Sequence, residues 1–228
     1  MEIFLNCSIV FSYASFPDEP VLSKTYKEEI MRTKTTLMIL AAMVLLLVGL
    51  LGCAGTGGGS TPYEGYSSVY LHTNIHGYTR NNRGTMEYLA SYANYVQPDT
   101  GHFFVPVNTV VSIGKWRGGF TMTRQDNGQL IYFEYRSGNM GGMSVEEYLN
   151  LITGPQPLSL KSLGATDLKG IKEGRVLKGM TKKGVEIAWG YPAKHRTPSL
   201  EDNVWTYWRN RWVMKTVTFS NGKVTQVQ

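Results

Sequence analysis

Cys53 is the residue with the clearest potential for chemistry, and it is one of only two cysteines in the 228-residue chain. It closes a stretch of uncharged residues that begins at Leu37 and follows a short basic head at residues 31–34. A basic head, about fifteen uncharged residues and a small residue at the exit are features of a secretory signal. A membrane-spanning helix is the alternative, but it takes roughly twenty apolar residues, and this run is shorter. The sequence therefore predicts that residues 31–52 are a signal peptide.

The end of this signal, Leu50-Leu51-Gly52-Cys53, resembles the lipobox of bacterial lipoproteins. In that family a diacylglyceryl group is attached to the cysteine sulfur, the chain is cut before the cysteine, and the new amino terminus is acylated. The resemblance implies signal cleavage between Gly52 and Cys53 and lipidation at Cys53. Each buried methylene contributes about 0.8 kcal/mol, so several acyl chains together anchor a protein firmly. A catalytic thiol is the alternative, but it would need a nearby base and would lie at the end of a flexible tether.

Other residues that could bind a metal or transfer a proton are few. His72 and His76 are four residues apart, which on a helix would place two imidazoles on one face, as zinc sites use. The surrounding sequence is typical of extended chain, so we interpret both as structural or surface histidines. Glu146 and Glu147 are adjacent on a predicted helix and point in different directions, so they do not form an acid–base pair. We therefore expect no catalytic residue, no metal and no cofactor.

Composition divides the chain into five segments. Residues 1–30 precede the basic head of the signal, and we interpret them as an upstream extension from a mis-assigned start, with a genuine cytoplasmic extension as the alternative. The signal peptide at 31–52 comes next. Residues 53–66 are rich in glycine, serine and threonine, which is typical of a flexible tether. Residues 67–160 are predicted to form a β-rich module, and residues 161–228 a separate α+β domain.

Charge is distributed unevenly along the predicted mature chain. Residues 53–160 contain six basic and seven acidic side chains, whereas residues 161–228 contain thirteen basic and five acidic ones. A basic domain tied to a membrane indicates an anionic partner, such as phospholipid head groups, lipopolysaccharide or an acidic protein face. A solvated basic surface without a partner is the alternative. The predicted export disfavours nucleic acid as a partner.

The module at residues 67–160 has the pattern of short strands, and we interpret it as β-rich, such as a partly open barrel. Asp126-Asn127-Gly128 predicts a hairpin, because Asn-Gly supplies the positive φ that a tight turn needs. Ser144 followed by two glutamates predicts a capped helix that ends near Ile152. Strands are predicted at residues 67–71, 104–113, 120–124 and 129–136.

The segment at residues 161–228 has a different order of elements. Asp167 is predicted to cap a helix that runs to Lys178, and Thr181 a second helix that runs to Trp189. Gly190 ends the second helix, and Pro192 prevents its continuation. Three strands are predicted at residues 204–209, 212–219 and 223–228, with an Asn-Gly turn between the last two. Two helices before a three-stranded antiparallel meander predict an α+β fold class.

Aromatic side chains surround Arg209-Asn210-Arg211 in this segment. On a strand, Trp205 and Tyr207 share one face, and we expect them to pack beneath the helices. Arginine and tryptophan are enriched at interface hot spots, and indole rings favour the depth of lipid head groups. The candidate contacts for a partner or for lipid are therefore Trp208, Arg209, Arg211 and Trp212.

A series of motifs within residues 166–228 resembles the BamE (SmpA/OmlA) family of outer-membrane lipoproteins. The motifs are Gly179-Met180-Thr181, Val185, Gly190-Tyr191-Pro192, Trp205-Thr206-Tyr207, Val217-x-Phe219 and Gly222-Lys223-Val224. The resemblance implies two helices on a three-stranded antiparallel sheet, a shape shared with β-lactamase-inhibitor proteins. It also implies lipid anchoring at the periplasmic face of the outer membrane and an accessory role in the assembly of β-barrel proteins there. The chain departs from the family in its long preceding module and in Gly184, where a polar helix former is expected.

These observations together predict a non-enzymatic lipoprotein that acts as a scaffold or accessory factor at the outer membrane. A lipid-anchored inhibitor or ligand-binding envelope protein is the alternative, because the same fold inhibits secreted enzymes. A third possibility, an enzyme, would need convergent acidic, histidine or cysteine side chains. The sequence contains no recognisable constellation of that kind.

Lipidation can be tested directly at the cysteine. We expect Cys53→Ala to abolish metabolic labelling of the chain with palmitate and to release it from the membrane fraction, because the acyl chains supply the anchor. Ser60→Ala, in the predicted tether of the same mature chain, is the control and should keep both the label and the membrane association. Persistence of the label in Cys53→Ala would contradict the lipobox interpretation.

Overall fold

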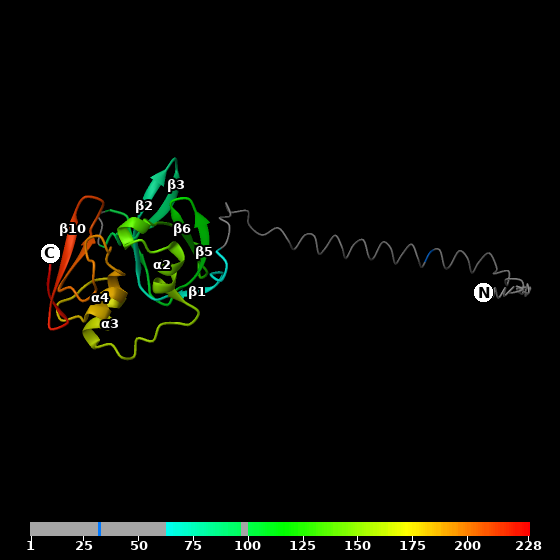
Figure 1. Cartoon of the computed structure of the whole chain (residues 1–228). Coiled ribbons are helices and arrows are strands. Elements are labelled where there is room, and N and C mark those ends of the chain that lie inside the picture. Colours follow the sequence, from blue (N-terminus) through cyan, green and yellow to red (C-terminus); the bar gives the residue numbers. More distant parts are fainter. Residues whose placement is uncertain (1–31, 33–62, 97–99) are drawn as a thin grey trace, which may run out of the picture. The chain divides into compact units, whose positions relative to one another are not determined.

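The computed structural model describes residue 32, residues 63–96 and residues 100–228, and the described residues from 63 onward belong to one compact unit (Figure 1). The predicted signal peptide apart from Arg32, the cleavage position at Gly52, the lipidation site at Cys53 and most of the predicted tether lie outside the described residues. Within the part that is described, no helix has the length and apolar character needed to span a membrane.

The largest element is an eight-stranded sheet, here called sheet A, which curls into a half-barrel. Its strand order is β4-β2-β3-β7-β6-β5-β1-β8, and every neighbouring pair is antiparallel except β3 with β7. The strands are β1 (Val69–Leu71), β2 (Ile75–Asn82), β3 (Thr85–Ser91), β4 (His102–Val105), β5 (Val110–Trp116), β6 (Gly119–Arg124), β7 (Leu130–Glu134) and β8 (Thr153–Gly154).

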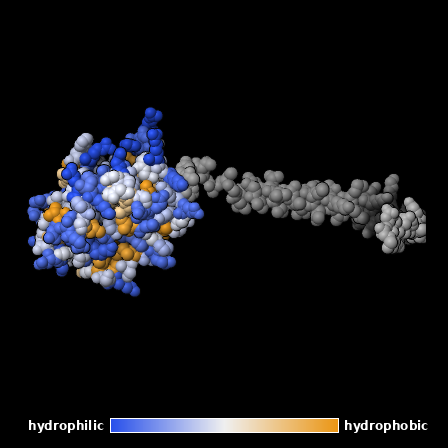
Figure 2. All heavy atoms as spheres, in the orientation of Figure 1, coloured by the Kyte–Doolittle hydropathy of each residue, from blue (hydrophilic) through white to orange (hydrophobic). Residues whose placement is uncertain are grey.

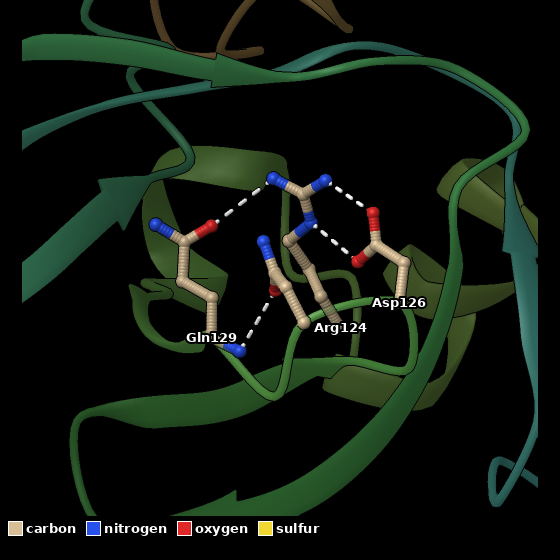
Figure 3. Close-up of polar contacts among 4 residues, drawn as sticks. Arg124, Asp126 and Gln129 are labelled. Atoms are coloured by element: carbon tan, nitrogen blue, oxygen red, sulfur yellow. Dashed lines mark hydrogen bonds and ion pairs between the residues drawn. The ribbon is translucent and has the colours of Figure 1, made fainter.

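Tight turns set the register of sheet A. The tip between β2 and β3 is a two-residue turn, Arg83 and Gly84, with both φ values positive, and this tip is strongly hydrophilic (Figure 2). The predicted hairpin around Asn127-Gly128 is confirmed as β6–β7. In its turn, the Arg124 guanidinium donates to Asp126 at 2.5 and 3.0 Å and to the Gln129 side chain at 3.2 Å (Figure 3).

Sheet A buries one face against a short helix. Helix α2 (Val145–Ile152) has the predicted serine cap, because the Ser144 hydroxyl accepts from the Glu147 amide at 3.1 Å and the Glu147 carboxylate accepts from the Ser144 amide at 2.7 Å. This capping box satisfies amides that a helix start leaves unpaired. A 3-10 turn, η1 (Ser137–Met140), precedes the helix. The fully buried side chains of this core, called core A, include Leu71, Ile113, Phe120, Met122, Ile131, Phe133, Met140, Tyr148 and Leu149.

A second core, core B, lies between two helices and a three-stranded antiparallel sheet, here called sheet B. The helices are α3 (Ala165–Glu173) and α4 (Lys182–Trp189), and the strands are β9 (Val204–Trp208), β10 (Met214–Ser220) and β11 (Lys223–Val227). Trp205 and Tyr207 are buried in core B beside Trp189, so the prediction that they pack beneath the helices is confirmed. The predicted Thr181 cap of α4 is also confirmed, since its hydroxyl accepts from the Gly184 amide at 3.0 Å.

Asp167 has a different role from the predicted one. Helix α3 begins after Gly164 and ends at Glu173, so Asp167 lies in its first turn and is not the cap. Its buried carboxylate instead accepts from the amide and the hydroxyl of Thr181, at 2.8 and 3.0 Å, and so ties the start of α4 to α3. A β-carbon on Gly184 would lie 2.1 Å from the Asp167 carboxylate. This contact explains why glycine stands where a polar helix former was expected.

The predicted α+β fold class, a β-rich module followed by a two-helix, three-stranded domain of BamE type, is wrong. The protein is mostly β, and the eight-stranded half-barrel dominates a structure with only three helices among the described residues. The two helices that were assigned to sheet B alone also contact sheet A. Their carbonyl groups accept hydrogen bonds from His76 on β2 and from Asn74, the residue just before β2. The two helices therefore form a layer shared by both sheets, and not one face of a separate domain.

Asn74 is the centre of the seam between sheet A and this helical layer. Its amide donates to the Ile187 carbonyl at 2.7 Å, and its side-chain NH₂ donates to the carbonyls of Ile171 at 2.8 Å and Ala188 at 3.3 Å. Its side-chain oxygen accepts from the Val107 amide at 2.8 Å. Asn74 is 1% exposed, so water molecules do not readily replace these hydrogen bonds.

Removal of this side chain should destabilise the whole compact unit. We expect Asn74→Ala to lower the free energy of unfolding by roughly 2 to 4 kcal/mol, because a buried amide and buried carbonyls lose their partner. Chemical denaturation measures the loss. Asn203→Ala, at an exposed position, is the control and should change stability by less than about 0.5 kcal/mol. Equal losses of stability in the two variants would contradict the prediction that the hydrogen bonds of Asn74 stabilise the fold.

Candidate functional site

A cleft of about 800 Å³ opens on the face of sheet A that points away from core A. Strands β2, β3, β5 and β7 and the loops that follow β3, β5 and β7 contribute to it. The loop between β9 and β10 of sheet B adds one more side chain, Arg211. Two classes of side chain dominate the lining. The cations are Arg80, Arg117, Arg136 and Arg211, and the aromatic residues are Tyr78, Tyr95, Trp116, Tyr132 and Tyr135.

Strand register explains why these side chains share one surface. Tyr78 on β2 pairs with Leu89 on β3, and Leu89 pairs with Tyr132 on β7, so the three lie side by side across the sheet. Neighbouring residues on a strand point to opposite faces. Ile131 and Phe133 therefore enter core A while Tyr132 faces the cleft.

The four arginines of the cleft fall into two electrostatic groups. Arg80 pairs with Glu87 at 2.6 Å, and Arg136 pairs with Glu134 at 2.9 Å. Neither Arg117 nor Arg211 has a carboxylate within ion-pair distance among the described residues, and both are exposed. The cleft thus presents two guanidinium groups whose charge is not neutralised by a neighbouring carboxylate.

The aromatic walls are held in edge-to-face pairs. The ring centroids of Tyr78 and Tyr95 lie 5.5 Å apart, and those of Trp116 and Tyr132 lie 5.4 Å apart. Gly118 allows the Trp116 ring to fold back over the turn, since a β-carbon there would lie 2.5 Å from the ring. Burial, followed by the charge of Glu134, raises the pKa of Tyr95. Its hydroxyl therefore stays protonated at neutral pH and remains a hydrogen-bond donor.

The four residues predicted to contact a partner occupy different environments. Trp208 is half-buried, packs against core A and stacks on His195 with 5.4 Å between ring centroids. Arg209 is exposed, and its amide donates to the Val213 carbonyl at 2.8 Å to close the hairpin. Arg211 enters the cleft, and the Trp212 side chain is 86% exposed. The structure thus brings only Arg211 into the cleft.

The cleft residues from sheet A were not anticipated from the sequence. Arg80, Arg117 and Arg136 are far apart in the chain, and only the pairing of β3 with β7 and of β6 with β5 and β7 brings them to one surface. The alternation of Tyr132 with Ile131 and Phe133 was the available signal, since it separates a buried face from a polar one.

The histidines lie apart from the cleft. His72 is near Gln156, with 3.0 Å between its Nε2 and the Gln156 carbonyl. His76 is 1% exposed, with its Nε2 2.7 Å from the Ala188 carbonyl and its Nδ1 3.1 Å from Nε2 of His102. A carbonyl only accepts, so His76 carries its hydrogen on Nε2 and accepts from His102 at Nδ1. In the described part of the chain, no three potential metal ligands come together.

No family model matches the chain, and the comparisons found neither a curated protein nor a solved structure that is similar to it.

Acid should weaken the fold through His76. Burial lowers the pKa of His76 from 6.5 to about 4. Above pH 6.5 the side chain is neutral in both the folded and the unfolded chain, whereas below it the unfolded chain takes up a proton first. We therefore expect the free energy of unfolding to fall as the pH drops from 6.5 to about 4, with a contribution of about 3 kcal/mol from this residue.

Denaturation curves at a series of pH values measure this dependence. His76→Gln removes the titrating group and should flatten the curve over that interval, relative to the unmodified chain. His195→Gln, at an exposed histidine, should leave the pH dependence unchanged. An unchanged slope in His76→Gln would show that His76 does not carry the effect.

Proposed function

We propose that this chain is a lipid-anchored, non-enzymatic binding protein of the bacterial outer membrane, and that the cleft on sheet A is its binding site. The proposal combines the lipobox resemblance at Cys53 with the geometry of the cleft. The observation that carries the binding function is the pair of guanidinium groups, Arg117 and Arg211, that line the cleft without a neutralising carboxylate among the described residues.

The chemistry of the lining supports binding. Guanidinium groups form bidentate, charge-assisted hydrogen bonds with carboxylates and phosphates. Aromatic walls supply large contact area at low entropic cost, and a volume of about 800 Å³ lies in the usual range for ligand sites. An accessory role in β-barrel assembly has less support. It was implied by the resemblance to the BamE family, and this chain does not have the fold that the resemblance implied.

The tip of the β9–β10 hairpin is a second candidate contact surface. Trp212 is 86% exposed, Val213 45% and Met214 51%, so three consecutive apolar side chains face solvent. The Asn210 side chain accepts from the amides of Trp212 and Val213, at 2.9 and 3.0 Å, and fixes the turn that presents them. This tip is the candidate contact with lipid or with a protein partner, beside the ligand in the cleft.

A photo-crosslinking amino acid in the cleft tests the binding function in cells. We expect the full-length chain with such a group in place of Trp116 to form a light-dependent adduct in the membrane fraction. The same group in place of Lys169, on the exposed side of α3, is the matched control and should form none. The double substitution Arg117→Gln/Arg211→Gln should reduce the adduct at position 116 several-fold, since a charge-assisted hydrogen bond contributes more than a neutral one.

Two results would contradict the proposal. Equal adduct yields at positions 116 and 169 would show that the cleft has no preferred occupant. Recovery of the chain from the soluble fraction only, with Cys53 intact, would remove the lipid anchor from the proposed function.

A further inference from the structure

We infer that the occupant of the cleft is an acidic saccharide: a short chain of sugar rings that carries carboxylate or phosphate groups. The inference rests on the proposed binding function and adds the chemical class of the ligand. Three features of the cleft carry it, which are the spacing of its cations, the arrangement of its aromatic rings and the scarcity of aliphatic side chains.

Arg80 and Arg117 are too far apart for a single small ion to contact both. Arg80 lies on β2, and Arg117 lies in the turn between β5 and β6. Strands β3 and β7 lie between β2 and β6, so three strand spacings, roughly 14 Å along the sheet, separate these two positions. An inorganic phosphate contacts one end of such a cleft, whereas a chain of several rings reaches both.

The four arginines of the cleft differ in the charge that they can offer a ligand. Arg117 and Arg211 are not neutralised by a described carboxylate and can hold an acidic group through bidentate hydrogen bonds. Arg80 and Arg136 are already paired with Glu87 and Glu134. Such pairs favour neutral polar groups, because the arginine can donate to a hydroxyl and the carboxylate can accept from one. Acidic groups at Arg117 and Arg211, with sugar hydroxyls at the two ion pairs, match this pattern.

The aromatic rings fit sugars better than nucleic-acid bases. Single-stranded nucleic acids bind on aromatic faces that successive bases stack against. In this cleft the two close ring pairs, Tyr78 with Tyr95 and Trp116 with Tyr132, are both edge-to-face, at 74° and 61°. Such rings offer separate faces in different directions. Each can receive the C–H-bearing side of one sugar ring, whose partial positive charge suits the negative face of an aromatic ring.

A lipid tail fits the cleft poorly. Leu89 and Ala90 are the only aliphatic side chains in its lining, and Ala90 is 2% exposed. Tyr78 and Tyr132 add hydroxyl groups to the same surface, whereas the Tyr135 hydroxyl donates to the Met143 carbonyl at 2.8 Å. An acyl chain would place the Tyr78 and Tyr132 hydroxyls and the guanidinium groups of Arg117 and Arg211 against hydrocarbon, at a cost that burial of hydrocarbon would have to exceed. A glycolipid could therefore enter only by its sugar head group.

Purified full-length chain in detergent, titrated with defined saccharides, tests the ligand class. The probe is α-1,4-linked trigalacturonate, and its matched control is α-1,4-galactotriose, which has the same rings without the carboxylates. We expect a change in tryptophan fluorescence with trigalacturonate, because Trp116 lines the cleft, and an affinity at least tenfold lower for galactotriose. Vesicles of phosphatidylcholine with a bis-phosphorylated diglucosamine lipid distinguish a glycolipid head group from a free saccharide.

Variants connect the binding to the cleft. Arg117→Gln/Arg211→Gln should weaken trigalacturonate binding at least tenfold, whereas Arg175→Gln/Arg196→Gln, which removes two exposed cations outside the cleft, should leave the affinity unchanged. Equal loss in both pairs would mean that only net charge matters, and would overturn the inference. Melting temperatures of the unmodified chain and the two double variants show whether each variant is folded.

Competitors supply the remaining outcomes. Inorganic phosphate that displaces trigalacturonate at equal concentration would reduce the site to a small-anion site, and hexathymidylate that binds more tightly would make it a nucleic-acid site. Either result overturns the inference. If no saccharide binds while the adduct at position 116 still forms in cells, the ligand class is wrong and the binding function stands. If both fail, the proposed function is wrong as well.

Discussion

The seam between sheet A and the layer of α3 and α4 is the constraint on which the rest of the structure depends. Short helices end with carbonyl groups that have no partner within the helix. Asn74 and His76 supply partners for three of them, Ile171, Ile187 and Ala188, in a region closed to water. A second contact, from the Asn94 side chain to the Tyr191 carbonyl at 2.6 Å, continues the seam beyond the end of α4. Buried polar groups must be paired, so these hydrogen bonds fix the position of the helical layer on sheet A. Strands β9 and β10 pack on that layer, so the seam also determines where Arg211 meets the cleft.

Elements with a local chemical signal could be predicted from the sequence, and elements formed by distant pairing could not. The Ser144 and Thr181 caps and the two Asn-Gly turns act within a few residues, and all four are present in the structure. Strands β2 and β3 have no such signal, because their turn places Arg83 at φ 53, where asparagine or glycine is usual. The parallel pairing of β3 with β7 joins residues more than forty positions apart. The sequence predicted a β-rich module such as a partly open barrel, but without these two strands its full extent and its contact with the helices were missed. The helices then had only sheet B to pack on, which is why the α+β class was predicted.

The residues of the candidate site also differ in whether a local pattern in the sequence could identify them. Arg211 was identified from the local cluster of arginine and tryptophan, but its partners in the cleft come from strands whose register no local pattern determines. The same cluster contains Trp208, which stacks on His195 and packs against core A, so composition alone does not separate a packing indole from an exposed one. The position of each residue along the strand does separate them, because alternate residues point to opposite faces. Trp205 and Tyr207 point into core B, and Trp208 faces the other way. This alternation does not apply to residues beyond the strand, such as Trp212. Their exposure depends on the turn that Asn210 fixes.

The seam and the cleft respond differently to acid. Hydrogen bonds to Glu87 and Glu134 raise the pKa of Arg80 and Arg136, and burial raises that of Tyr95, so these groups keep their charge state near neutral pH and in mild acid. His76 differs, because its Nδ1 accepts a hydrogen from His102 and its Nε2 donates to Ala188. A proton on Nδ1 would face the N–H of His102, so both histidines would have to rearrange before His76 could become charged. The hydrogen bonds from Asn74 to Ile187 and Ala188 do not titrate, so they would still hold α4 to sheet A. Acid would therefore weaken the seam at His76 alone, while the charges of the cleft arginines stay the same.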